Sequence, residues 1–179
     1  MRQKPREFRL HTLGPTGTNC EAAARYWLEQ RGYRADGVVL HETLETAVNG
    51  VLAEPRDCAL LGCVVYPQLH EIIFQNLGTM SLRECFVMPT HRMVLAGDLS
   101  REVTTVLSHA APASLLDDLG VQIKMAKSNA DAALGCVRGE ADACITTIVA
   151  AQANELTVIK DFGAVSMGFS IHAPHGVHI

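Results

Sequence analysis

The sequence predicts an α/β protein with largely parallel strands, divided into two lobes. Three observations predict this class. Short apolar or β-branched runs alternate with helical segments along the 179 residues, polar or glycine-containing turns separate them, and capping residues stand before most of the helices. Strands that alternate with helices in this way form sheets covered by helices.

The expected strands are short and come at regular intervals. They cover residues 8–13, 37–40, 104–107, 121–126, 142–146, 157–162 and 166–173. Most are rich in β-branched or other apolar residues, which favour extended structure. The last two are expected to close the sheets.

Helices follow most of these strands, each behind a capping side chain. They are expected near residues 19–30, 44–53, 113–119, 130–138 and within 146–154. The expected caps are Thr18, Thr43, Ser108 or a neighbour, Ser128, and Thr146 or Thr147. Glu21 and Asp131 stand three residues after their caps, which is the spacing of a capping box.

The spacing of these units suggests two lobes. Lobe one is expected to comprise residues 1–88 plus 160–179, and lobe two residues 92–158. The extended run RECFVMPTHRMVLAGDLS could cross from one lobe to the other. Strand-end turns would then face an interlobe cleft, which is where open α/β sheets bind ligands.

The bulk composition excludes several classes of protein. The chain is 48% hydrophobic and 19% charged, as soluble globular proteins are. Its net charge is −4, and only the N-terminal RQKPREFR is notably basic, which argues against nucleic acid as the main partner. We find no apolar run long enough to span a membrane and no secretion signal at the start, so a cytoplasmic location is expected.

Cysteine and histidine spacing gives no sign of a metal site. The six cysteines form no CxxC motif, and most stand in apolar surroundings, as buried reduced thiols do. The eight histidines are scattered along the chain. We therefore expect no metal.

The stretch GPTGT after the first strand is the most unusual turn in the chain. Two glycines and a proline are unfavourable inside a regular element, but they suit a loop that brings its backbone close to a ligand. The helix that follows would point its first N–H groups over this loop. Gly17, Thr18 and Asn19 are therefore candidates for holding an anion, and a merely tight turn is the alternative.

Several segments together resemble the prephenate dehydratases. TLGPTGTNCEAA resembles the opening signature of that family, and VLSHAAPASLL resembles its Ser-His-Pro segment. The run from SNADAALG to VIKDF resembles the family's order of cap, helix, glycine, strand, helix and strand. The resemblance implies two α/β lobes like a periplasmic-binding-protein domain (type II), with the substrate between them. The family's regulatory ACT domain is not expected.

Two departures from the dehydratase pattern point to one branch of the superfamily. Dehydratases carry Thr-Arg-Phe near the end of the catalytic domain, where this chain has Ser166–Ser170 and keeps only the aromatic residue. They also carry Pro-Ile-Glu-Asn-Ser where this chain has Gly62–Tyr66. The non-aromatising prephenate decarboxylases of bacilysin-type antibiotic biosynthesis lack the same Thr-Arg pair, and the chain resembles that branch most.

The resemblance singles out candidate site residues. His109 is the candidate for proton transfer, with Thr147 and Ser170 as further catalytic candidates. The candidates for binding substrate are Gly17, Thr18, Asn19, Cys63, Tyr66, Arg92, Ser108, Ser128, Thr146, Met167 and Phe169. Each has an ordinary alternative: the hydroxyls as helix caps, Met167 and Phe169 as core, Arg92 and His109 as solvated side chains.

The expected function is decarboxylation of prephenate, or of a close cyclohexadienyl analogue, in specialised-metabolite biosynthesis. No cofactor is required, because the ring of the substrate accepts the electrons that carbon dioxide leaves behind. The alternatives are a dehydratase-like enzyme on a related acid and a non-catalytic module that binds a small acid. The expected partner is a small carboxylate, with no nucleic acid or membrane, and a homodimer is possible.

Overall fold

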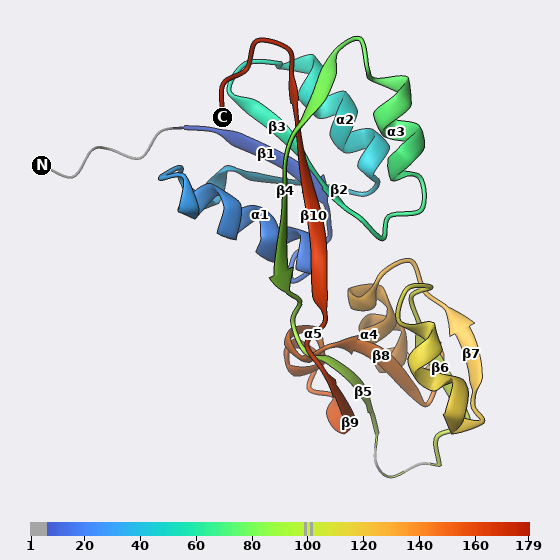
Figure 1. Ribbon diagram of the computed structural model, residues 1–179. Helices are drawn as coiled ribbons and strands as arrows, with labels where there is room; N and C mark the ends of the chain where they lie inside the picture. Colours follow the sequence, from blue (N-terminus) through green and yellow to red (C-terminus); the bar gives the residue numbers. More distant parts are fainter. Residues whose placement is uncertain (1–6, 99, 101) are drawn as a thin grey trace, which may run out of the picture. The chain divides into compact units, whose positions relative to one another are not determined.

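The computed structural model describes residues 7–98, 100 and 102–179. The chain divides into two compact units (Figure 1). The first holds the chain up to Met88 together with Met167–Ile179, and the second is the uninterrupted segment Pro89–Ser166. The basic run RQKPREFR lies largely outside the described residues.

The first unit contains a five-stranded sheet in the order β2-β1-β3-β10-β4. β1 pairs in parallel with both β2 and β3, whereas β10 runs antiparallel to β3. The strands are β1 Arg9–Leu13, β2 Val38–His41, β3 Cys58–Cys63, β4 Met80–Pro89 and β10 Ser166–Pro174.

Helices cover both faces of this sheet. On one face Leu10 and Leu61 pack with Trp27 of α1 in one apolar cluster. Leu60, the neighbour of Leu61, packs instead in a second cluster with residues of α2 and α3. This alternation is what a strand buried on both faces requires. The helices are α1 Asn19–Gln30, α2 Leu44–Ala53 and α3 Leu69–Gln75, with a short 3-10 helix at Ala35–Gly37.

The second unit contains a sheet in the order β7-β6-β8-β5-β9. β6 pairs in parallel with β7 and β8, while β5 runs antiparallel to β8 and β9. The strands are β5 Met93–Gly97, β6 Thr105–Ser108, β7 Gln122–Met125, β8 Ala143–Thr147 and β9 Thr157–Gly163. Its helices are α4 Asn129–Val137, α5 Ile148–Ala153 and the 3-10 helix Ala113–Leu119.

The chain enters and leaves the second unit side by side. Met93 of β5 pairs with Gly163 of β9, and the Thr90 N–H donates to the Val165 carbonyl at 2.8 Å. The sequence placed the return to the first lobe at residue 160. In the structure β9 belongs to the second sheet, and the return begins at Met167.

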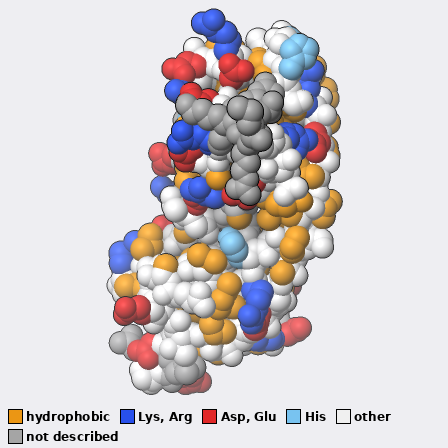
Figure 2. Space-filling model, turned by 90° about the vertical axis from the view of Figure 1, so that its left-hand side faces the viewer, with side chains coloured by type: hydrophobic (Ala, Val, Ile, Leu, Met, Phe, Trp, Pro, Cys, Tyr) orange, Lys and Arg blue, Asp and Glu red, His pale blue; other side chains and the backbone are white. Residues whose placement is uncertain are grey.

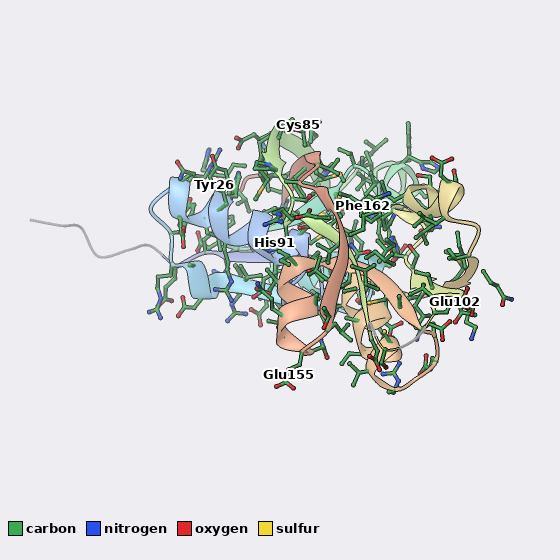
Figure 3. The ribbon with its side chains drawn as sticks, turned by 90° about the horizontal axis from the view of Figure 1, so that it is seen from below. Tyr26, Cys85, His91, Glu102, Glu155 and Phe162 are labelled. Carbon is green, nitrogen blue, oxygen red and sulfur yellow. The ribbon has the colours of Figure 1, made fainter. Side chains whose placement is uncertain are left out.

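Four of the expected caps are present. Thr18, Thr43, Ser128 and Thr147 each accept a backbone N–H at the start of their helix. The expectation that Ser108 or a neighbour caps a helix is corrected, because the segment 113–119 is a 3-10 helix that follows Pro112 without a side-chain cap. Past α5, Glu155 (Figure 3) adopts a left-handed φ of 56° before β9 begins.

The face drawn in Figure 2 carries charged and apolar side chains together. On this face, side chains of both charges are interspersed with the apolar ones. This distribution differs from the single-sign stripe of a nucleic-acid-binding surface. Among the described residues, no helix has the length and apolarity needed to cross a membrane.

Candidate functional site

Polar side chains gather at one edge of the second sheet, which we call the sheet-2 edge. β6, β7 and β8 are parallel, so their carboxyl ends lie at the same edge. Ser108 ends β6, Thr146 and Thr147 end β8, and Ser128 follows β7. Two of the loops at this edge lead into α4 and α5, so helix N-termini and hydroxyl groups are brought together.

The hydroxyl groups of the sheet-2 edge differ in whether they already donate a hydrogen bond within the protein. Thr146 is fully buried and donates to the Asn129 carbonyl at 2.6 Å, which fastens β8 to the start of α4. Thr147 accepts from the Ala150 N–H at 3.1 Å, and Ser128 accepts from the Asp131 N–H at 3.0 Å. Because accepting leaves a hydroxyl its proton, Thr147 and Ser128 can each still donate to a ligand.

Asn129 is the residue of this edge that the sequence reasoning did not identify. Its side-chain Oδ1 is buried and has no hydrogen-bond partner among the described residues. Asn129 is also the first residue of α4, where backbone N–H groups lack an intrahelical acceptor. The available signal was an asparagine, a poor helix former, placed directly after a serine cap.

His109 lies in the loop after β6. The Ala111 N–H donates to its Nδ1 at 3.3 Å, so the neutral ring carries its proton on Nε2. Burial lowers the pKa of His109 below its usual value. At neutral pH the ring is therefore an uncharged hydrogen-bond donor. The neighbouring Ser108 hydroxyl is occupied by its own loop, donating to the His109 carbonyl at 2.9 Å.

Arg92 stands immediately before β5 at the same edge, and its carbonyl accepts the Ile148 N–H at 2.8 Å. Its guanidinium forms an ion pair with Asp161 of β9. The positive charge expected to face a substrate carboxylate is therefore already balanced by the protein itself.

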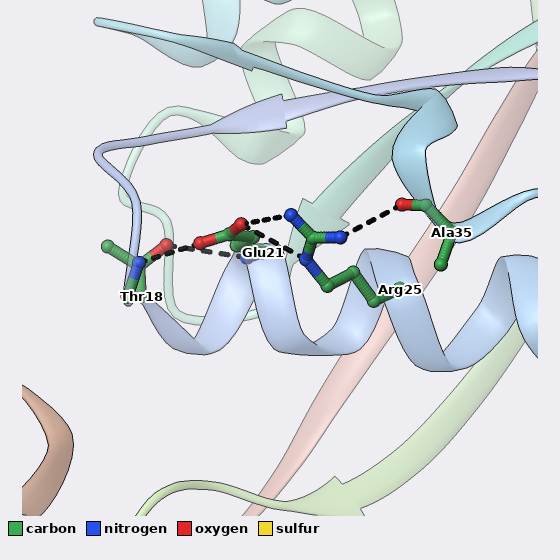
Figure 4. A network of polar contacts seen from close by, with 5 residues as sticks. Thr18, Glu21, Arg25 and Ala35 are labelled. Carbon is green, nitrogen blue, oxygen red and sulfur yellow. Dashed lines mark hydrogen bonds and ion pairs between the residues drawn. The ribbon is translucent and has the colours of Figure 1, made fainter.

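In the first unit the GPTGT turn differs from the expected anion site. The Gly17 N–H donates to Oε2 of Glu21 at 2.6 Å, and Arg25 binds the other carboxylate oxygen (Figure 4). Glu21 thus supplies the anion that the turn was expected to take from a ligand. Thr18 caps α1 and Asn19 begins it. The expectation that Gly17 offers a free backbone N–H to a ligand is therefore corrected, because this N–H belongs to a hydrogen-bond network at the start of α1.

Cys63 and Tyr66 are engaged within the first unit. The Tyr66 hydroxyl donates to Glu45 at 2.7 Å and lies 3.4 Å from the Leu44 N–H, so it supports the start of α2. The Cys63 thiol packs against Cys20 of α1. The hydrogen bond from Cys20 lowers the pKa of Cys63, and the same bond together with burial raises that of Cys20.

β10 carries the remaining candidates. Phe169 is a core residue, almost fully buried and stacked on Phe86 with ring centroids 5.6 Å apart. Met167 is partly buried against the same cluster. Ser170 is buried, and its Oγ lies 2.9 Å from Nε2 of His172, two residues along the strand. The sequence reasoning did not single out His172, although the two side chains share one face of the strand.

Two stacked imidazoles, the buried His11 and the half-buried His41, lie on the first sheet. His11 Nδ1 is 2.9 Å from His41 Nε2, and the rings stack with centroids 5.1 Å apart. Burial, then the neighbouring His41 and Arg9, lower the pKa of His11 to about 4. Among the described residues no three histidine, cysteine or acidic side chains are grouped as metal ligands.

Comparisons with named proteins bear on the family. No protein-family model matches the chain. The chain is 24% identical to prephenate decarboxylase of Bacillus subtilis (strain 168), over 90% of this chain and 84% of that protein. It is 28% identical to prephenate decarboxylase of Planktothrix agardhii, over 93% and 89%. A prephenate dehydratase of Amycolatopsis methanolica is 30% identical over 84% of this chain, which spans 52% of that protein.

Solved structures bear on the fold alone. GqqA, described as a novel type of quorum quenching acylase, matches 95% of this chain with a TM-score of 0.65 and 12% identity. The match spans 65% of that chain. The periplasmic VFT2 domain of Bordetella pertussis BvgS matches 94% of this chain and 81% of its own, with a TM-score of 0.54 and 14% identity. The expected two-lobed, periplasmic-binding-protein-like α/β fold is confirmed.

Proposed function

We propose that this chain, which belongs to the prephenate dehydratase-like superfamily, decarboxylates prephenate or a close cyclohexadienyl analogue without forming an aromatic ring. The proteins named prephenate decarboxylase match over more than four-fifths of their own length, which supports the same kind of activity for this chain. We further propose a cytoplasmic enzyme of specialised-metabolite biosynthesis, which needs no cofactor.

The observation that carries the proposal is the set of donors and one free acceptor at the sheet-2 edge. The positive end of α4 and the hydroxyls of Ser128 and Thr147 can donate to a carboxylate. The Asn129 Oδ1, which lacks a donor among the described residues, can accept a hydrogen bond from a hydroxyl group. Prephenate carries two carboxylates and a ring hydroxyl, so its groups match both kinds of partner.

The reaction needs positioning more than it needs a reactive side chain. The bond between the ring carbon and its carboxylate breaks, carbon dioxide leaves, and the electron pair moves into the ring diene. A ring carbon then takes a proton, and the hydroxyl stays on the ring because this chain lacks the Thr-Arg pair that dehydratases carry. In this proposal the edge residues hold the acid and remove water from the leaving carboxylate, which raises its tendency to depart.

His109 is the proposed proton carrier. Its ring is neutral at neutral pH because burial lowers its pKa, so the fraction able to deliver a proton falls as the pH rises above that value. A rate step that depends on the His109 imidazolium therefore slows toward alkaline pH. A His109→Gln variant would lose this pH dependence while keeping a hydrogen-bond donor.

The deciding experiment incubates the purified protein with prephenate and follows the products by ultraviolet absorbance and mass spectrometry. Loss of carbon dioxide with the hydroxyl retained supports the proposal. Phenylpyruvate would overturn it in favour of a dehydratase-like enzyme, which the 30% identity to a named dehydratase keeps as the second candidate. Stabilisation by prephenate without turnover would indicate a binding module.

A matched pair of variants tests the edge. Asn129→Asp places a negative charge where the proposed substrate is an anion, and we expect kcat/KM to fall about 100-fold, as for a lost polar contact to reacting groups. Gln152→Glu makes the same amide-to-acid change on the exposed side of α5. Equal activity of the two variants would contradict the proposal that Asn129 contacts the substrate.

A further inference from the structure

The first unit contains a pocket of about 140 Å³ that none of the candidate site residues lines. It lies among β3, β10, α3 and the chain from the end of α3 into β4. Its lining residues are Leu60, Ile72, Ile73, Asn76, Leu77, Met80, Ser81, Leu82 and His172.

The walls of this pocket are mostly apolar. Leu60, Ile72 and Met80 are buried members of one hydrophobic cluster. Two leucines of the lining remain in water: Leu77 is 58% exposed and Leu82 is 54% exposed. A molecule seated here would remove apolar surface of both leucines from water, which is favourable in proportion to the area covered.

The polar groups of the lining are few and uncharged. The Asn76 side-chain amide already donates to the Ile72 carbonyl at 2.8 Å. His172 shares its Nε2 with Ser170, and burial lowers its pKa, so the ring is neutral at neutral pH. Water needs two to four polar partners to be held in a cavity, and a charged ligand needs a counter-charge, so neither suits this lining.

We propose that the pocket binds an uncharged molecule with one six-membered ring and one hydroxyl group, of the size of phenol. An apolar cavity of about 150 Å³ accommodates a benzene molecule, which matches the volume of this one. The imidazole of His172 supplies the neutral polar contact for the hydroxyl group. Because His172 is hydrogen-bonded to Ser170, a ligand that contacts His172 also affects Ser170. The binding proposed here does not rest on the proposed function.

Titration calorimetry with phenol on the whole protein tests the binding without any turnover. We expect one phenol per chain with a Kd of about 0.1 to 1 mM, the range open to a ligand of so few atoms. Benzoate, which has the same ring and a negative charge, should bind at least about tenfold more weakly. Phenol that fails to bind at 10 mM, or benzoate that binds equally well, would overturn the proposal.

Two tryptophan variants locate the site. Leu77→Trp fills the rim of the pocket from an exposed position and should abolish phenol binding. Phe74 lies on α3, is 72% exposed and lines no part of the pocket. The Phe74→Trp variant should therefore bind phenol as the parent protein does. Circular dichroism checks that both fold. Equal binding by the two variants would place phenol elsewhere and refute this pocket, whatever the outcome with prephenate.

Discussion

At the scale of single residues, the His11–His41 pair is the most sensitive arrangement in the first unit. His11 is 6% exposed, and its Nδ1 can share one proton with His41 Nε2 only while at least one ring is uncharged. Gly50 of α2 makes room for the pair, because a Cβ there would lie 2.6 Å from His11 Nδ1. Arg9 and Glu54 are the charged side chains that act on His11.

This pair predicts a loss of stability in mild acid. The pKa of His11 is about 4 in the folded protein and near 6.5 in the unfolded chain, so the unfolded chain binds more protons between these values. The free energy of unfolding should therefore fall as the pH drops from 6.5 toward 4, by about 2 kcal/mol at pH 5 from His11 alone.

Urea unfolding at pH 7.5 and pH 5.0 measures this effect. The His11→Asn variant keeps a polar atom near the Nδ1 position but cannot take up the proton, so its stability should fall by about 2 kcal/mol less than that of the parent. His109 and His172, whose pKa values burial also lowers, are present in both proteins and cancel in the comparison. Equal losses in the two proteins would contradict the role of His11.

The residue scale also shows what the sequence could not give. Ser128 and Thr147 were identifiable because a cap and its helix are neighbours in the chain. The partners of Gly17 and Arg92 were not, because a glycine-rich turn and a lone arginine carry no mark of which carboxylate they meet. The Glu21 carboxylate was expected to accept the backbone N–H of the cap residue Thr18, and it accepts that of Gly17 instead. The partner of Arg92 is Asp161, on another strand.

At the scale of elements, local sequence signals predicted the bounds of helices better than those of strands. The helices at 19–30 and 44–53 have the expected bounds because a cap marks each start. β3 was not among the expected strands, since its buried run CALLGC has no alternation that separates a strand from a helix. The segment 113–119 was expected to be an α-helix and is a 3-10 helix without a side-chain cap.

The start of α5 gives a prediction at this scale. Thr147→Ala removes the side-chain acceptor for the Ala150 N–H and should lower the free energy of unfolding by about 1 kcal/mol. Thr147→Ser keeps the hydroxyl and should change stability by a few tenths of that amount. Chemical denaturation of the three proteins checks the order. A serine variant as unstable as the alanine variant would mean that the methyl group, and not the cap, matters.

At the scale of the molecule, the two units differ in how the chain builds them. The second unit is continuous, its entering and leaving strands are hydrogen-bonded at Thr90 and Val165, and it has apolar clusters on both faces of its sheet. The first unit needs β10, which comes after the whole of the second unit, to lie between β3 and β4. A strand that far along the chain was recognisable in the sequence, but its neighbours in the sheet were not.

This difference predicts that the second unit folds alone. A polypeptide of residues 89–166 should show a single cooperative transition in urea by circular dichroism. A polypeptide of residues 1–88, which lacks β10, is the contrasting case and should show no cooperative transition. A fragment 89–166 that unfolds gradually would show that its stability depends on the rest of the chain.

The place of β10 has a consequence for synthesis. Growing from its N-terminus on the ribosome, the chain completes every strand of the second sheet before β10 is made. Until then β3 and β4 each have an unpaired edge where β10 will lie, and unpaired edges favour pairing with other chains. The nascent protein is thus most exposed to aggregation, and most in need of a chaperone, in the interval between the translation of β4 and that of β10.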